Sequence, residues 1–263
     1  LNTARQRISV RRHARLVDYY LHEGNNARAW MHLKLENANR LEISPKDFFF
    51  TTLPDGESRN KELINESDLP GNNHSYHVFE PLVPDPNENI SLHHDQNDIK
   101  IYTWQNQLCC LPKGSTQATL VENGSRHQDD IQEQFLTKGE SFGNLSKESG
   151  RRKNCTLSLA EGDFLLFEEV KSPTTGKMVD SDPTHRHIVR IKNIKEEIDD
   201  LCDPPQSVLT ITWDSKDALP FDLCLSNVIQ IEDKCEMIEN ISVARGNIVM
   251  VDHGRTIFEE DLG

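Results

Sequence analysis

The sequence has few of the residues that a compact globule or a membrane protein needs. Aromatic residues make up 6% and all hydrophobic residues 35% of the 263 residues, against 27% charged residues, which is polar for a compact domain. We therefore expect long loops and a large wetted surface. No run approaches the roughly 18 consecutive apolar residues of a spanning helix, and the N-terminus lacks a signal-peptide pattern. Direct membrane insertion is not predicted.

Positive charge is scarce as well. The chain has 29 Lys and Arg against 43 Asp and Glu, a formal net charge of -14 at pH 7. A protein with this mean field is repelled by phosphate backbones and by anionic lipid surfaces. The composition therefore argues against a nucleic-acid partner, with a basic N-terminal stretch as the one exception.

The motifs of common catalytic and cofactor sites are also missing. No P-loop, dinucleotide fingerprint or G-x-S-x-G elbow occurs, so no cofactor and no nucleophilic enzyme is predicted. No C-x-x-C pair occurs either, which argues against a disulfide framework and favours reduced thiols in strand-like segments. The six cysteines are Cys109, Cys110, Cys155, Cys202, Cys224 and Cys235.

Alternating apolar and polar residues dominate what is present and predict a mainly β (α+β) chain. We expect several small β-sandwich or barrel-like modules with a short N-terminal helix and long loops. The predicted division is a helix and β module at 1–121, a polar and mobile insertion at 122–154, a β module at 155–240 and the start of a further β segment at 241–263. A second helix is considered at 193–201. The start at Leu1 suggests a fragment of a longer protein.

An amphipathic helix is predicted near the N-terminus, with Ser9 as its N-cap. Its other face is basic and carries Arg11, Arg12 and Arg15. This basic face is either a solvated surface or a docking site for an acidic partner. The apolar face at helical spacing consists of Val10, Ala14, Val17 and Leu21.

A short pattern occurs twice, at 160–168 and at 244–252. Both copies read Ala-x-Gly followed by Asp or Asn, four apolar residues and an acid. Glycine permits the positive φ of a tight turn, and the Asp or Asn side chain bonds nearby backbone N–H groups before a buried strand begins. The pattern indicates β construction and not catalysis.

His185 and His187 form an H-x-H pair that projects two imidazoles from one face of a strand, a geometry that suits a shared metal ion. Val189 and Ile191 continue that face, which favours a half-buried core histidine at 187 with a hydrogen-bond partner. A metal site also needs a third ligand that no spacing fixes. The candidates are His93, His94, Asp95, Glu168 and His253.

The C-terminal stretch Asp252-His253-Gly254 lies between two apolar runs and has the look of an active-site loop. An Asp-x-Gly sequence also supplies the local bonding and the positive φ of a hairpin turn. Acid–base work by His253 needs a second group, and nothing in the sequence nominates one. A turn is the favoured interpretation.

Several stretches, taken in their order along the chain, resemble one family. The resemblance is to the baseplate assembly proteins related to baseplate J, found in extracellular contractile injection systems, and it covers nearly the whole chain except the 122–154 insertion. The stretches are SVRRHARLVD at 9–18, NARAW at 26–30, YTW at 102–104, CCLPKG at 109–114, GDFLLFEEV at 162–170, DPTHRH at 182–187, DALPF at 217–221, ARGN at 244–247 and DHG at 252–254.

This resemblance implies a structural role and no enzyme activity. The expected function is a baseplate wedge component that assembles in the cytoplasm, becomes part of the particle and relays the contraction signal. The implied partners are a second wedge subunit, the spike or hub protein, the sheath initiator and the inner tube proteins. The alternative is a metal-binding β-module enzyme or a sugar-binding module that uses His185 and His187.

Overall fold

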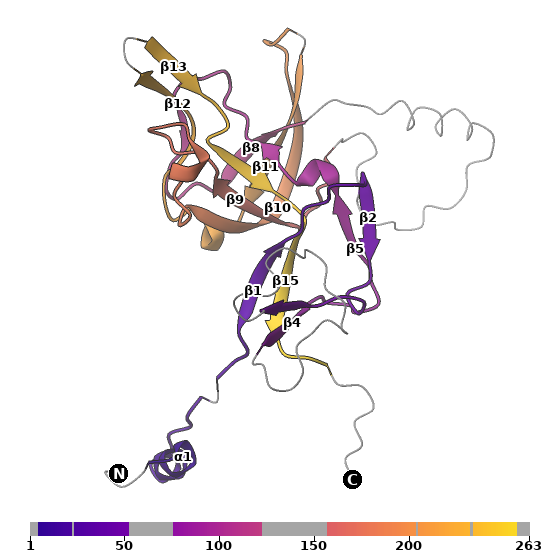
Figure 1. Ribbon diagram of the computed structural model, residues 1–263, viewed down its shortest axis with the longest axis vertical. Coiled ribbons are helices and arrows are strands. Elements are labelled where there is room, and N and C mark those ends of the chain that lie inside the picture. Colours follow the sequence, from indigo (N-terminus) through magenta and orange to yellow (C-terminus); the bar gives the residue numbers. More distant parts are fainter. Residues whose placement is uncertain are drawn as a thin grey trace, which may run out of the picture. The chain divides into compact units, whose positions relative to one another are not determined.

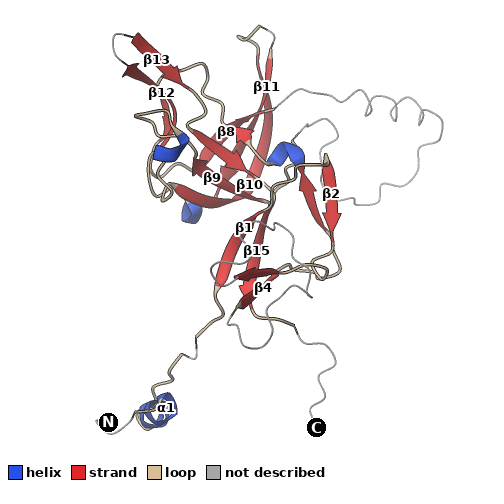
Figure 2. Ribbon diagram, viewed as in Figure 1, coloured by secondary structure: helices blue, strands red, loops and turns tan. Residues whose placement is uncertain are grey.

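The computed structural model describes residues 5–22, 24–52, 76–122, 157–203, 205–231 and 234–256. The mainly β prediction is confirmed, since strands predominate and α1 (Arg7–Arg15) is the one α-helix of the described residues (Figure 2). Within these residues, no helix has the length and apolar character needed to span a membrane. The insertion predicted to be mobile lies outside the described residues, except for Glu122.

The chain forms two compact units, each assembled from segments far apart in sequence. The terminal unit consists of Leu1–Ala29, Phe48–Leu82 and Val251–Gly263, and the core unit consists of Trp30–Asp47 and Val83–Met250. The predicted division ran consecutively along the chain. By contrast, the largest sheet draws strands from all three predicted β segments. Strand pairing between distant segments therefore sets the organisation.

A six-stranded antiparallel sheet organises the core unit (Figure 1). In spatial order its strands are β6 (Ile99–Lys100), β14 (Ser242–Arg245), β9 (Phe164–Glu169), β10 (Arg186–Asp199), β11 (Gln206–Trp213) and β8 (Gln117–Val121). Apolar side chains alternate along these strands and meet on one face, as in Leu165 and Phe167 of β9, which are fully buried. The ring of Phe167 lies 5.3 Å from that of Trp213 on β11.

The long strand β10 changes partner along its length. Residues 186–190 pair with β9, residues 191–199 pair with β11, and the register shifts between Ile191 and Asn193. Such an irregularity bends a strand and increases its twist, which curls the sheet. The helix considered at 193–201 is wrong, because β10 continues as a strand to Asp199. Pairing with β11 outweighs the helix-favouring Lys and Glu residues there.

Two smaller sheets complete the core unit. One has the order β13 (Lys234–Ile238), β12 (Leu223–Ile231) and β7 (Cys109–Leu111), and the other pairs β2 (Arg40–Ile43) with β5 (Ile90–His93). In the described part of the chain, three 3-10 turns lie between strands: η2 (His94–Gln96), η3 (Met178–Asp180) and η4 (Ser215–Asp217). All five described cysteines are free thiols, and Cys155 lies outside the described residues.

The terminal unit contains α1, β3 (Phe50–Thr52) and β4 (His77–Pro81). These two strands belong to a four-stranded sheet in the order β1 (Arg28–His32), β15 (Ile248–His253), β4 and β3. The boundary between the units falls within β1 and within β15.

The prediction for α1 is corrected at both ends. The helix begins at Arg7, so Ser9 lies inside it and Gln6 is the N-cap. It ends at Arg15, and Asp18 turns the chain with a φ of 53°. None of its residues is buried.

The two copies of the Ala-x-Gly pattern act differently. The first is the predicted turn: Gly162 has a φ of 101°, and the backbone N–H of Ala160 donates to Asp163 Oδ2 at 2.8 Å. The second differs, because the positive φ belongs to Asn247, at 53°. Gly246 is instead needed for close approach, since a Cβ there would lie 2.6 Å from Gln96 Oε1.

Candidate functional site

His185 lies just before β10 in a cluster that sequence reasoning did not identify. Its Nδ1 is 2.7 Å from Glu169 Oε2, and its ring stacks on Phe221 with centroids 4.7 Å apart. Glu169 is buried and also accepts the backbone N–H of Asp182 at 2.9 Å. Glu168 was one of the five candidates for a third metal ligand beside the pair, but neighbouring strand residues face opposite sides, and the adjacent Glu169 is the residue that contacts the imidazole.

His187 is half-buried, and its Nε2 lies 3.0 Å from the carbonyl oxygen of Asp217. Both imidazoles of the pair thus contact the segment from Asp217 to Phe221, yet each has its own partner. Among the described residues, no group of three or more His, Cys, Asp or Glu side chains could hold a metal ion. The proposed third ligands, His93, His94, Asp95, Glu168 and His253, do not gather around the pair.

His253 lies in the terminal unit, where its Nε2 is 3.2 Å from Nδ1 of His77. Its strand β15 pairs with β4, and the backbone N–H of Gly254 donates to the Val78 carbonyl at 2.9 Å. Gly254 has a φ of 143°, which glycine adopts readily. The predicted hairpin does not form with β15, because β1 and β4 occupy both of its edges, and Arg255 and Thr256 are not in a strand.

A larger candidate for ligand binding is a cleft of about 660 Å³ in the core unit, here called the Trp30 cleft. Its floor is made by two directly opposed pairs of β9 and β10, Glu168 with Arg186 and Leu166 with Ile188. This volume falls within the range of small-molecule sites, about 300–1,000 Å³. The lining residues are Trp30, His32, Leu166, Glu168, Arg186, His187, Ile188 and Ile248.

The charged groups of the Trp30 cleft neutralise one another. Glu168 receives Arg186 Nε at 2.9 Å on one carboxylate oxygen and Arg245 Nε at 2.7 Å on the other. Arg245 also donates to Asp98 Oδ1 at 2.6 Å and to the carbonyl of Asn97 at 3.1 Å. Two guanidinium groups thus balance two carboxylates, and the cleft carries no excess charge from this network.

His32 is the polar residue in the Trp30 cleft that lacks a partner. Its Nε2 is buried and makes no hydrogen bond in the structure. Burial lowers the pKa of His32 below 6.5, and the positive charge of Arg245 lowers it further, against the opposing effects of Asp98 and Glu168. The imidazole is therefore neutral at pH 7, with one nitrogen able to accept a hydrogen bond.

Trp30 forms an apolar wall of this cleft. Its ring is 40% exposed and packs against Phe164, with centroids 4.6 Å apart. Arg190 lies over the same phenylalanine, 5.6 Å from the ring centroid. Sequence reasoning missed Trp30 and His32 as site residues. Their alternation along β1 placed them on one face, but nothing in the sequence indicated that β9 and β10 would lie beside that face.

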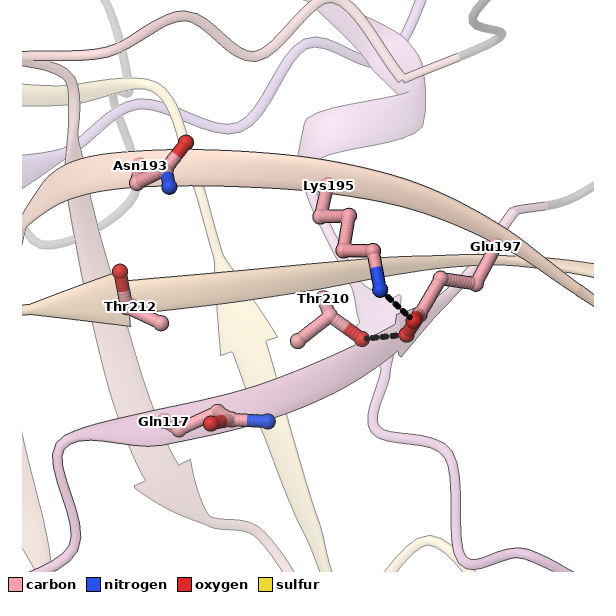
Figure 3. Close-up of a pocket in the computed structure, with 6 residues that line it drawn as sticks. All are labelled: Gln117, Asn193, Lys195, Glu197, Thr210 and Thr212. Atoms are coloured by element: carbon pink, nitrogen blue, oxygen red, sulfur yellow. Dashed lines mark hydrogen bonds and ion pairs between the residues drawn. The ribbon is translucent and has the colours of Figure 1, made fainter.

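A second, smaller hollow of about 250 Å³ lies over β8, β10 and β11 (Figure 3). Three of its polar side chains bond to each other, since Glu197 receives Lys195 Nζ at 2.6 Å and the Thr210 hydroxyl at 2.7 Å. These bonds also lower the pKa of Glu197. The remaining lining residues are Gln117, Asn193 and Thr212. We regard this hollow as the solvated face of the sheet.

The predicted partner surface on α1 is accessible. Arg12 and Arg15 are exposed and Arg11 is half-buried. Large apolar side chains are exposed in the same segment, including Leu16 at 82% and Val17 at 77%. The segment thus presents basic and apolar groups together. In comparisons with known proteins, no family model, no curated protein and no solved structure matches the chain.

Proposed function

We propose that the chain is a structural wedge component of a contractile injection machine, where it contacts the spike or hub, the inner tube, the sheath initiator and a second wedge subunit. The collinear stretches that resemble the baseplate J-related proteins support this function. The mainly β architecture agrees with it, since sheets with long connections offer extended contact surfaces. In this role the chain acts through rigid contacts and carries no catalytic group of its own.

The observation that carries the proposal is the surface of α1 and the residues that follow it. Its exposed apolar side chains are Ile8, Val10, Leu16, Val17, Tyr19 and Tyr20. Exposed apolar groups gathered in one segment mark an interaction site. Arg12 and Arg15 add positive charge to a chain of net charge -14, so a partner with an acidic rim and an apolar centre fits this segment. We assign it to the second wedge subunit.

The test is charge reversal of α1 in cells that produce the particle. We expect Arg11→Glu, Arg12→Glu and Arg15→Glu together to remove the chain from sedimented particles, as followed by mass spectrometry and cryo-electron microscopy. A matched variant changes three exposed lysines of the core unit to Glu, at Lys100, Lys113 and Lys177, with the same change in net charge. This control should assemble normally.

The outcomes separate the surface from the function. Normal assembly of the arginine variant, with unchanged circular dichroism, removes α1 as the contact surface. Failure of the unmodified chain to sediment with sheath, tube and spike proteins overturns the wedge function itself. Loss of assembly in both variants attributes the effect to net charge and also removes α1 from consideration.

The alternative function was a metal enzyme or a sugar-binding module built on His185 and His187. The two imidazoles are engaged separately, by Glu169 and by the Asp217 carbonyl, so this pair offers no shared ligand position. A binding site for a small molecule is better supported elsewhere, in the Trp30 cleft, and it is independent of the wedge function.

A further inference from the structure

We propose that the Trp30 cleft binds a neutral sugar residue, with the ring of Trp30 as its apolar platform and Nε2 of His32 as its buried hydrogen-bond partner. This site differs from the His185 and His187 pair considered from the sequence, because only His187 belongs to its lining. The proposal does not depend on α1 or on the wedge function.

The first argument is that the cleft combines an apolar wall with a few polar groups. Sugars present an apolar C–H face and a rim of hydroxyl groups, so they need a flat hydrophobic wall beside a few fixed polar groups. The cleft supplies the wall through Trp30, whose position is fixed by its packing on Phe164. It supplies polar groups through His32 and Arg186, while Leu166 and Ile188 add apolar floor. Sites for small ligands have this mixture of many apolar and few polar groups.

The second argument is the buried nitrogen of His32. A polar atom shielded from water without a hydrogen bond is unfavourable, and native proteins rarely leave one unpaired. His32 Nε2 is in this condition, and His32 is one of the residues that line the cleft. A ligand hydroxyl can donate to this nitrogen when the imidazole is neutral, or accept from it in the other tautomer. Hydroxyl groups suit both forms.

The third argument concerns charge and selects a neutral ligand. Both carboxylate oxygens of Glu168 are occupied by arginines, and Arg245 is shared with Asp98. An anionic ligand would have to compete with Glu168 for Arg186, and a cationic one would have to compete with the arginines for Glu168. The Arg186 side chain is 55% exposed and meets Glu168 through Nε, so its two terminal nitrogens can donate to hydroxyl groups of a bound sugar.

The experiment measures binding of four methyl glycosides, of glucose, galactose, mannose and N-acetylglucosamine, to the full chain. Saturation-transfer NMR and tryptophan fluorescence report binding. We expect at least one sugar to bind saturably with millimolar affinity, and Trp30→Ala to weaken it by about tenfold or more, as loss of an aromatic platform does. His32→Leu should weaken binding, whereas His32→Gln, which keeps a hydrogen-bonding group, should weaken it less.

A matched control is Trp104→Ala, since Trp104 is also in the core unit, is 50% exposed and does not line the cleft. It should leave sugar binding unchanged. Trp30→Tyr keeps a flat ring and guards against a folding defect in Trp30→Ala. Saturable binding to none of the four glycosides overturns the proposal. Equal binding by Trp30→Ala, or tighter binding of glucuronate than of the neutral sugars, overturns it as well.

Discussion

The core unit and the terminal unit differ in how many of their apolar residues they bury. The core unit buries a continuous cluster that includes Leu120, Phe167 and Ile211, all fully shielded from solvent. In the terminal unit, Val251 is the only buried apolar residue among those described, and α1 buries none. The core unit is therefore stabilised by its own apolar core, while the described part of the terminal unit leaves most of its large apolar side chains exposed or half-buried.

The largest effect expected from this contrast is in the core. Phe167→Ala removes a fully buried ring that packs on Trp213, and it should lower the free energy of unfolding by about 3–5 kcal/mol. Leu16→Ala in the terminal unit removes a side chain that is 82% exposed and should change it by less than about 0.5 kcal/mol. Denaturant unfolding followed by fluorescence measures both. Equal losses in the two variants contradict the contrast.

A second test concerns polar contacts in the core unit between two segments that are far apart in sequence, residues 93–96 and residues 246–247. Asn247 accepts the backbone N–H of His93 at 2.9 Å and donates to its carbonyl at 2.8 Å, and both residues are buried. Gly246 lies against Gln96, so Gly246→Ala forces a Cβ to within 2.6 Å of Gln96 Oε1. Overpacking of this kind costs about 1–3 kcal/mol.

Calorimetry of Gly246→Ala, alone and in a Gln96→Gly background, tests whether the clash with Gln96 causes the loss of stability. If the clash with Gln96 is responsible, the second background should reduce the cost of Gly246→Ala. An equal cost in both backgrounds attributes it to the backbone at Gly246 instead.

The sequence allowed local features of the core unit to be predicted better than its long-range ones. Strand β8, strand β11 and the turn at Gly162 follow from alternation and from turn chemistry within a few residues. The strand at 193–199 was not predicted, because its pairing with β11 overrides local helix propensity. Asn247 was expected to bond nearby backbone, whereas its partner is 154 residues away.

The site was less predictable than the fold for the same reason. His185 was singled out, but its partner Glu169 differs by one residue from the candidate Glu168, and one step along a strand changes the face. The Trp30 cleft requires β1 to lie near β9 and β10, which only tertiary pairing decides. A single sequence therefore indicates which residues share a face, and not which faces meet.

A third test compares two histidine contacts: that of His185 with the buried Glu169 in the core unit, and that of His77 with His253 in the terminal unit. Glu169→Ala removes a buried carboxylate and leaves the backbone N–H of Asp182 without its acceptor, so it should cost about 1–3 kcal/mol. His77→Ala in the terminal unit removes an exposed contact with His253, and water replaces it at a cost of less than about 0.5 kcal/mol. Thermal unfolding should rank the two variants in this order. The reverse order indicates that the terminal unit depends on its own polar contacts.

The smallest effect expected is a pH dependence confined to the core unit. Burial and Arg245 lower the pKa of His32 in the folded chain below its unfolded value near 6.5, while Asp98 and Glu168 oppose this and Lys34 adds to it. Between these two pKa values the unfolded chain binds more protons. Stability is thus fully present above pH 6.5 and falls as the pH drops through the window. His32→Gln removes this linkage, so its unfolding free energy should vary less than that of the unmodified chain from about pH 6.5 to 5. Hydrogen exchange should show the difference in core-unit amides and not in those of α1. Identical pH profiles for the two chains would mean that His32 keeps its unfolded pKa despite its burial beside Arg245.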